Sequence, residues 1–205
     1  MAIGQALSAH KDRPETIALI GSSQLTNEDA AELKKLFADH LKIGAGDWTG
    51  PAHLGDQDDF LVRADKNPNT AGIETVFKGV PKTPSAEIFK AIDEGKVKIL
   101  YVCGQDLVTQ FGEAKVAELR KKLDLFVYQG SNENKTAEYA HWVLPSAVYA
   151  EKDGHFTNFE GRVQRINKAF APLGVSLPDS EIFQRLIQAL DFVPSPLAGE
   201  GQGGG

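Results

Sequence analysis

Short apolar runs that alternate with helix-like stretches constrain the fold of this chain most. The runs are TIALIG (16–21), VKILYVC (97–103), LFVYQ (125–129) and HWVLP (141–145). The first two runs, with their β-branched and long aliphatic side chains, are typical of strands buried on both faces, and the last two are predicted to be further strands, the fourth ending at Pro145. Because helical patterns lie between them, the sequence predicts an α/β fold with a doubly wound, mostly parallel sheet.

Capping signals and helical periodicity predict the helices. Thr26 and Asp29 have the spacing of a capping box, Thr83 followed by Pro84 marks a second helix start, and Asp179 is the expected N-cap of the last helix. The expected buried faces are Leu33, Leu36, Phe37 and Leu41; Ile88, Phe89 and Ile92; Val116, Leu119 and Leu123; and Ile182, Phe183, Leu186, Ile187 and Leu190.

The domain organisation follows from where these patterns stop. Residues 1–193 are expected to form one α/β domain, and the Gly-rich residues 194–205 a flexible tail. Residues 44–82 are predicted to be a long irregular insertion, in which FLVRA (60–64) is at most one strand or extended segment. Loops of this length are uncommon in compact domains unless they are functional or packed against something else.

Composition excludes several classes of function. A net charge of −6 with dispersed Lys and Arg argues against a nucleic-acid partner. Cys103, the only cysteine, cannot hold an iron–sulfur cluster, and the five histidines lack metal-ligand spacing, so no metal site is predicted. No apolar run approaches the roughly 20 residues that span a bilayer, so direct membrane insertion is not expected.

Three loops are expected at the carboxyl edge of the sheet, where parallel sheets bind ligands. They are GSSQ (21–24), GQD (104–106) and QGSNEN (129–134), each with a glycine beside small or amide side chains. Such loops suit a phosphate or a nucleobase, but strand-to-helix turns need the same residues, and no dinucleotide or P-loop fingerprint is present. No catalytic residue is predicted, since no serine has a nucleophile-elbow context and no carboxylate pair can be assigned.

The segment EKDGHFTNFEGR (151–162) is predicted to be an irregular turn. Gly154 would permit a tight turn and Gly161 a second irregular backbone position. The side chains of Asn158, Glu160 and Arg162 could satisfy the backbone from within the segment.

Three segments resemble the molybdopterin oxidoreductase family. They are AIDEGKVKILYVCGQDL (91–107), YAHWVLPSAVYAEKDGHFTNFEGRVQRI (139–166) and PDSEIFQRLIQAL (178–190), and the resemblance covers about residues 58–192. It implies a Rossmann-like α/β domain, similar to the third domain of formate dehydrogenase. In catalytic members this domain binds one half of a bis-molybdopterin guanine dinucleotide.

The resemblance also implies which positions would border that dinucleotide. They are Gly104, Gln105, Asp106, Gln129, Gly130, Asn158 and Arg162. Asp106 could accept hydrogen bonds from guanine, and Arg162 could bind the pyrophosphate as a fork.

Within the family, VYQG (127–130) and DKNPNTAGIE (65–74) are most similar to the large iron–sulfur subunit of NADH–quinone oxidoreductase, complex I. The family's cofactor-ligating Cys, selenocysteine or Ser has no counterpart in this sequence. Its N-terminal cluster-binding region and C-terminal β-barrel domain have none either. Gly130 replaces an acid that is common in catalytic members. The resemblance therefore implies a non-catalytic scaffold domain without its own cofactor. Electrons would pass through iron–sulfur clusters elsewhere in the subunit. The expected partners are other domains and subunits of a complex on the cytoplasmic side of the inner membrane.

Two alternatives remain open. The chain could be a molybdopterin guanine dinucleotide-binding domain of a formate-dehydrogenase-like oxidoreductase, with the metal ligand on another segment. It could also be an unrelated flavodoxin-like binding module.

Overall fold

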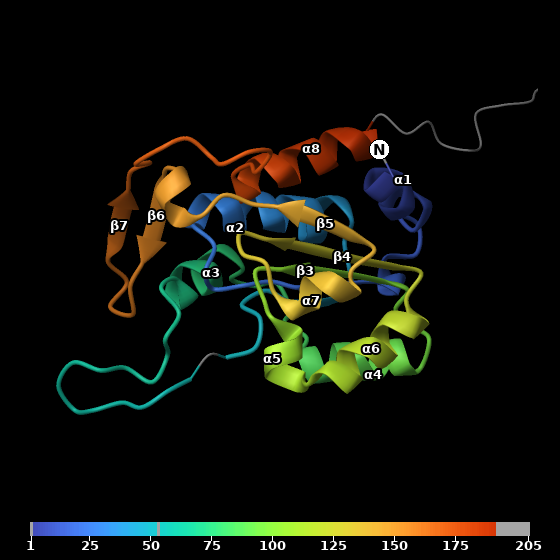
Figure 1. Cartoon of the computed structure of the whole chain (residues 1–205), viewed down its shortest axis with the longest axis horizontal. Helices are drawn as coiled ribbons and strands as arrows, with labels where there is room; N and C mark the ends of the chain where they lie inside the picture. The colour runs from blue at the N-terminus through green and yellow to red at the C-terminus, as the bar shows by residue number, and fades with distance from the viewer. Residues whose placement is uncertain (1, 53, 192–205) are drawn as a thin grey trace, which may run out of the picture.

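A parallel sheet organises the part of the chain that the computed structural model describes, residues 2–52 and 54–191 (Figure 1). Its strands lie in the order β2-β1-β3-β4-β5, and every neighbouring pair is parallel. Their bounds are β1 Ile17–Ile20, β2 Ala45–Asp47, β3 Ile99–Cys103, β4 Leu125–Gly130 and β5 Trp142–Pro145. The predicted α/β fold class is confirmed, and the strand order reverses between β1 and β3, where such sheets form a crevice.

Helices cover both faces of this sheet (Figure 1). On one side lie α1 (Ala2–Ala9), α2 (Asn27–Lys34) with its π-helical continuation η2 (Lys35–His40), α3 (Thr70–Val76) and α8 (Asp179–Asp191). On the other lie α4 (Ser85–Asp93), α5 (Leu107–Phe111), α6 (Glu113–Lys122) and α7 (Lys135–Tyr139). The short turns η1 (Pro14–Thr16) and η3 (Tyr149–Glu151) connect elements. No described helix is long and apolar enough to cross a membrane.

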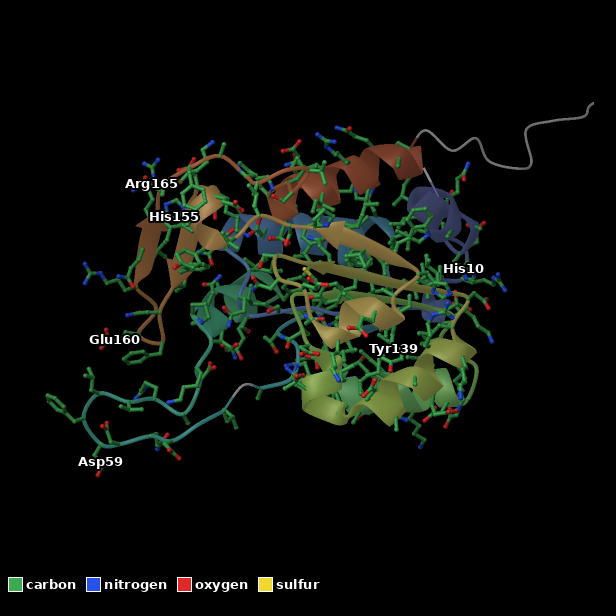
Figure 2. The ribbon with its side chains drawn as sticks, viewed as in Figure 1. His10, Asp59, Tyr139, His155, Glu160 and Arg165 are labelled. Atoms are coloured by element: carbon green, nitrogen blue, oxygen red, sulfur yellow. The ribbon has the colours of Figure 1, made fainter. Side chains whose placement is uncertain are left out.

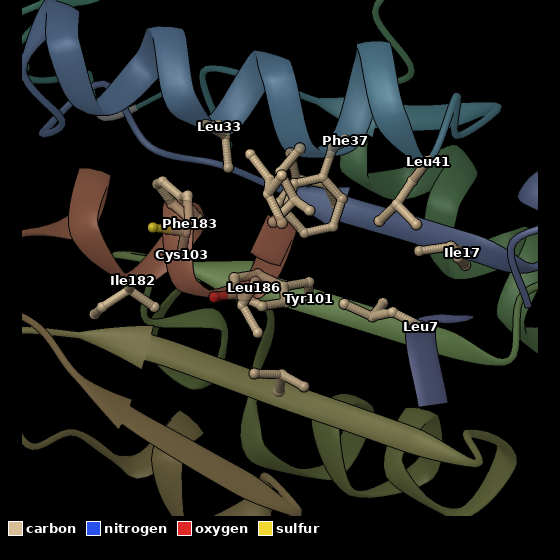
Figure 3. Close-up of a cluster of buried hydrophobic side chains, with 14 of the residues drawn as sticks. Leu7, Ile17, Leu33, Phe37, Leu41, Tyr101, Cys103, Ile182, Phe183 and Leu186 are labelled. Atoms are coloured by element: carbon tan, nitrogen blue, oxygen red, sulfur yellow. The ribbon is translucent and has the colours of Figure 1, made fainter. Parts of the chain in front are cut away.

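Alternating side chains of the central strands supply two separate apolar clusters. Leu19 and Tyr101 face the cluster under α1, α2 and α8, whereas Ile20 faces the cluster under α4 and α6. In the first cluster the rings of Phe37 and Phe183 pack on Tyr101, with centroids 5.0 and 6.4 Å from its ring (Figure 3). Burial of both strand faces explains why these runs are apolar at every position.

Helix starts agree with the sequence at α2 and depart from it at α4 and α8. Thr26 and Asp29 form the predicted capping box. Helix α4 begins one residue after Pro84, and its first amide, that of Ser85, donates to the carboxylate of Asp47 from the end of β2. Asp179 was expected to cap α8, but this prediction is wrong, because its carboxylate turns toward the sheet and the amide of Ser180 donates to Asp29 instead.

Residues 44–82 are less irregular than predicted. They contain the edge strand β2, which pairs with β1 through Ala45–Asp47, and helix α3, which buries Ile73. Neither element has a strong sequence signal, because strand β2 is short and contains a glycine and helix α3 lacks a side-chain cap. Both elements depend on surfaces that distant parts of the chain provide. Residues 60–64 form no strand, and the predicted tail 194–205 and His53 lie outside the described residues.

A separate antiparallel hairpin, β6 (Gly154–Thr157) and β7 (Val163–Ile166), follows the sheet. The prediction of a tight turn at Gly154 is wrong, because this residue begins β6 and pairs with Ile166. A glycine is required there by close approach, since a Cβ would lie 2.8 Å from the Cγ2 of Thr26. Gly161 does occupy the irregular turn, with φ of +80°.

We predict that Phe183→Ala lowers the free energy of unfolding by about 3–5 kcal/mol, because it removes a fully buried ring from the larger cluster. Urea unfolding measured by circular dichroism checks this. The control Phe60→Ala removes a ring that is 94% exposed and should change stability by less than about 0.5 kcal/mol. Equal effects of the two substitutions would contradict the described core.

Candidate functional site

The three loops predicted to converge do meet at the carboxyl edge of the sheet. They border a cavity of about 1130 Å³. From these loops the lining residues are Ser22 and Gln24, Gly104 and Asp106, and Gly130, Ser131, Asn132 and Asn134. The remaining lining residues include residues 146–150, Lys152, Phe156, Phe170 and Asp179, together with Lys66 and Pro68. The location and size of this cavity are those of a ligand cleft in an open α/β sheet.

Two glycines bring backbone to the cleft, for different reasons. Gly104 has φ of +65°, a conformation that other residues rarely adopt, and lies against Ser22. At Gly130 a Cβ would overlap the hydroxyl of Tyr128, which accepts a hydrogen bond from Asn134 at 2.6 Å. The space where a side chain at position 130 would stand is therefore filled by Tyr128.

Asp106 lines the cleft, but its carboxylate is occupied by its own chain. It accepts hydrogen bonds from the hydroxyls of Thr109 at 2.6 Å and Thr136 at 2.7 Å, and from the amide of Val108 at 3.1 Å, which caps α5. Partial burial opposes the charge, but hydrogen bonds from the two threonines outweigh it and hold the pKa of Asp106 below its ordinary value. Asp106 is thus an ionised helix cap.

The two predicted glutamines lie behind the cleft rather than in its lining. Gln129 is fully buried, donates to Asp179 at 2.6 Å and accepts from the hydroxyl of Tyr101. Gln105 is buried as well, and its Oε1 accepts from the Nε2 of Gln110 at 2.8 Å. Both side chains serve the packing of the domain.

Asn158 and Arg162 lie in the turn of the β6–β7 hairpin and are not among the residues that line the cleft. The Oδ1 of Asn158 accepts from the amides of Glu160 at 3.0 Å and Arg162 at 2.9 Å. The prediction that this turn satisfies its own backbone therefore holds for Asn158. Of the seven predicted positions, Gly104, Asp106 and Gly130 come together at the cleft.

Lys152, which the sequence analysis did not single out, forms a buried ionic cluster at the floor of the cleft. Its ammonium group lies 2.7 Å from Asp29 and 2.6 Å from Asp179, and its side chain is 6% exposed. Burial opposes the charge of Lys152, but the carboxylates of Asp179 and Asp29 outweigh it and raise its pKa above the ordinary value. Burial raises the pKa of Asp179, and Lys152 only partly offsets this.

This cluster joins four elements that are distant in the sequence. Asp29 belongs to the capping box of α2 and also caps α8 through the amide of Ser180 at 2.9 Å. Asp179 begins α8 and accepts from Gln129 of β4, while Lys152 precedes β6. The thiol of Cys103 lies 4.0 Å from Asp179, and burial raises its pKa, in agreement with a hydrophobic role for this cysteine.

Asn69 provides a second link that the sequence did not reveal. It is fully buried, donates to the carbonyl of Leu25 at 2.7 Å and accepts from the amide of Thr157 at 2.6 Å. The segment 65–74 thereby connects the loop after β1 to the hairpin. No helix was predicted after Asn69, and its side chain does not cap α3, so the sequence carried no local signal for this link.

The charges around the cleft do not fit a pyrophosphate. Two lysines are among its lining residues. Lys152 is bound by two carboxylates, and Lys66 donates to the carbonyls of Asp56 and Arg63, both at 2.6 Å. Within the described residues, no three metal-ligating side chains are grouped. Both ammonium groups are therefore already bonded within the chain.

A sequence model of a family described as "Molybdopterin oxidoreductase" matches residues 43–189. The chain belongs to the molybdopterin oxidoreductase family. The resemblance to this family is thereby confirmed for residues 58–189, and the segment 139–166, one of those that carry it, contains both Lys152 and the hairpin.

Curated relatives in this family are much longer than the matched segment. The chain is 40% identical over 120 residues to "Putative formate dehydrogenase YrhE" of Bacillus subtilis (strain 168), which is 58% of this chain and 12% of that protein. It is 40% identical over 105 residues to "NADPH-Fe(3+) oxidoreductase subunit alpha" of Geobacter sulfurreducens (strain DL-1 / KN400), 51% of this chain and 12% of that one. The chain thus spans about an eighth of these relatives.

A solved structure, acetylene hydratase from Pelobacter acetylenicus, is similar at 19% sequence identity. The TM-score is 0.47, and the similarity covers 54% of this chain and 16% of that one.

We predict that Lys152→Met lowers the free energy of unfolding by about 3–5 kcal/mol, because it leaves two buried carboxylates without a cation. Chemical unfolding checks this. The matched control Lys168→Met, at an exposed position, should change stability by less than about 0.5 kcal/mol. A cost below about 1 kcal/mol for Lys152→Met would contradict the ionic cluster.

The same cluster predicts an alkaline loss of stability. Because the pKa of Lys152 is higher in the folded than in the unfolded chain, its stabilising contribution is complete below about pH 10.4 and declines as the pH rises above that value. The stability difference between the wild type and Lys152→Met should shrink between about pH 10 and pH 12. Unfolding curves of both proteins across this range measure the difference, and a constant value would rule out titration of Lys152.

Proposed function

We propose that this chain acts as a non-catalytic structural domain of a molybdopterin-oxidoreductase-family subunit, of the kind in the large iron–sulfur subunit of NADH–quinone oxidoreductase. One observation carries the proposal. Most of the polar side chains at the predicted dinucleotide positions, those of Asp106, Gln105, Gln129 and Asn158, are hydrogen-bonded within the chain itself. A domain that binds through side chains keeps several convergent polar groups for its ligand.

Electrostatics at the cleft floor supports the same proposal. A pyrophosphate is stabilised by free cationic groups or by helix N-termini. Here the ammonium group of Lys152 is already bound by the carboxylates of Asp29 and Asp179, and the N-terminus of α5 is capped by Asp106. A dianionic group at this edge would meet carboxylates already in place.

Gly130 adds a further argument. The resemblance implies an acid at this position in catalytic relatives, and Tyr128 fills the corresponding space here. A carboxylate at position 130 would require Tyr128 to move, so the structural arrangement and the sequence difference agree with each other.

In this proposal the chain carries no redox centre of its own. Residues 1–193 form one domain, electrons pass through iron–sulfur clusters elsewhere in the subunit, and the partners are other domains and subunits of the complex. We place that complex on the cytoplasmic side of the inner membrane, peripheral to it.

A second candidate is a domain that binds one half of molybdopterin guanine dinucleotide in a formate-dehydrogenase-like oxidoreductase. The cleft and the positive φ of Gly104, which brings backbone to its edge, favour this candidate. The name of the Bacillus subtilis relative favours it too. In this case the backbone of Gly104 and Gly130 would border the dinucleotide, Arg162 would have to reach it by a movement of the hairpin, and another segment would supply the metal ligand.

We predict that GDP at millimolar concentration does not raise the melting temperature of the chain, because Lys152 at the cleft is bound by two carboxylates and the polar side chains at most of the predicted positions are hydrogen-bonded within the chain. Differential scanning fluorimetry measures this, with ADP as the matched control and with wild type and Arg162→Ala compared. Molybdenum and pterin assays on the assembly purified from its native host provide the second readout. A GDP-specific increase that Arg162→Ala abolishes, or stoichiometric molybdenum, would favour the second candidate, since a ligand in excess of its Kd must stabilise the fold.

A further inference from the structure

The segment 54–66 extends away from the body of the domain and ends in apolar side chains (Figures 1 and 2). Phe60 is 94% exposed, Leu61 77% and Val62 42%. Asp59, labelled at the far end of this segment in Figure 2, lies next to them in the sequence. Single exposed apolar residues are ordinary on protein surfaces, but three in succession at the end of a projecting segment are not.

One carboxylate shapes the end of this segment. The Oδ1 of Asp58 accepts hydrogen bonds from the amides of Phe60 at 2.9 Å, Leu61 at 2.6 Å and Val62 at 2.7 Å. The amide of Asp58 in turn donates to the carbonyl of Val62 at 2.9 Å. These bonds from Val62, Leu61 and Phe60 lower the pKa of Asp58, so the turn is held by an ionised group at neutral pH. The three apolar side chains therefore project from a closed turn.

The two legs of the segment are also joined to each other. The amide of Gly55 donates to the carbonyl of Ala64 at 2.9 Å, and Leu54 pairs with Asp65 in an antiparallel bridge. Lys66 crosses the segment to the carbonyls of Asp56 and Arg63. These bonds hold the end of the segment at a defined distance from the domain.

A contact with the β6–β7 hairpin orients the segment. The guanidinium of Arg63 lies 3.9 Å from the ring centroid of Phe159, a cation–π distance. Figure 2 shows Glu160, the residue after Phe159, at the end of the hairpin and facing this segment. The fold thus orders a turn on which Phe60 and Leu61 remain largely exposed.

We propose that Phe60, Leu61 and Val62 form a docking knob that inserts into an apolar pocket with a basic rim on another polypeptide of the native assembly. Preordering of the turn lowers the entropy that binding must overcome. Segment 54–66 carries four aspartates against Arg63 and Lys66, and Arg63 is directed to Phe159. The resulting negative charge, with Asp56 and Asp59 exposed, complements Lys and Arg at the edge of a pocket. The same charge disfavours an anionic lipid surface.

The proposal requires that the chain belong to a larger assembly, which both candidate functions share. It does not depend on whether the cleft binds a dinucleotide, so the nucleotide and molybdenum results leave it unaffected. Conversely, a result showing that Phe60, Leu61 and Val62 contact no partner would leave both candidate functions possible.

Photo-crosslinking tests the partner directly. We expect the substitution Phe60→p-benzoylphenylalanine, introduced into the full chain in its native host, to give adducts in the purified assembly that map to one apolar segment of a different polypeptide with adjacent Lys or Arg. The matched control Leu173→p-benzoylphenylalanine, at a position 82% exposed, should give no such single adduct. The proposal is overturned by adducts on lipid or detergent, by adducts only on second copies of this chain, by scattered adducts, or by purification of the chain without any partner.

Substitutions test the energetics. The double variant Phe60→Ser with Leu61→Ser should weaken association with the crosslinked partner about tenfold or more in a binding titration, while the melting temperature of the chain alone stays unchanged. The control, Leu173→Ser with Val175→Ser, removes equally exposed apolar side chains and should leave association unchanged. Asp58→Asn should give a smaller loss, because a neutral acceptor holds the three amides less strongly. Unchanged association in the Phe60/Leu61 variant, or a fall in its melting temperature equal to that of a core substitution, would overturn the proposal.

Discussion

The rest of the carboxyl edge of the sheet depends on the ion pairs that the buried ammonium group of Lys152 forms with Asp29 and Asp179. The ammonium group lies between Asp29, in the first turn of α2, and Asp179, the first residue of α8, and Gln129 extends the contact into β4. An isolated charge in this position would be expensive, and the cluster is stable because each carboxylate also accepts amide or side-chain hydrogen bonds. Through it, one side chain of the family signature fixes the relative positions of two helices and the sheet.

Polar side chains around the cleft are likewise hydrogen-bonded within the chain, and this determines which groups remain available to a ligand. Three loops border a large cavity, yet the polar side chains at the positions predicted to border a dinucleotide cap α5, support β4 and close the hairpin turn. A cleft shaped for a ligand but lined with occupied groups is the reason for preferring a structural role. The resemblance to complex I and the formate dehydrogenase named among the relatives point to different members of one family.

Much of the fold could be predicted because its signals are local. The apolar runs at β1, β3, β4 and β5 and the capping box at Thr26 are set by residues that are neighbours in the sequence. Strand β2 and helix α3 could not be predicted, because β2 is stabilised by pairing with the edge of β1 and α3 is stabilised by burial of Ile73. The expected cap at Asp179 was wrong for the same reason, because a carboxylate 150 residues upstream, that of Asp29, reaches the amide of Ser180.

The sequence by itself determined the fold class, the location of the ligand edge and the family, since periodicity, turn residues and a dense signature are all properties of contiguous segments. Only the tertiary structure decided which polar groups are free. Hydrogen-bond partners of Lys152, Asn69 and Gln129 come from elements that are distant along the chain. Whether a side chain serves a ligand or the fold depends on those partners, because a buried polar group bonds whichever complementary group folding brings within about 3 Å.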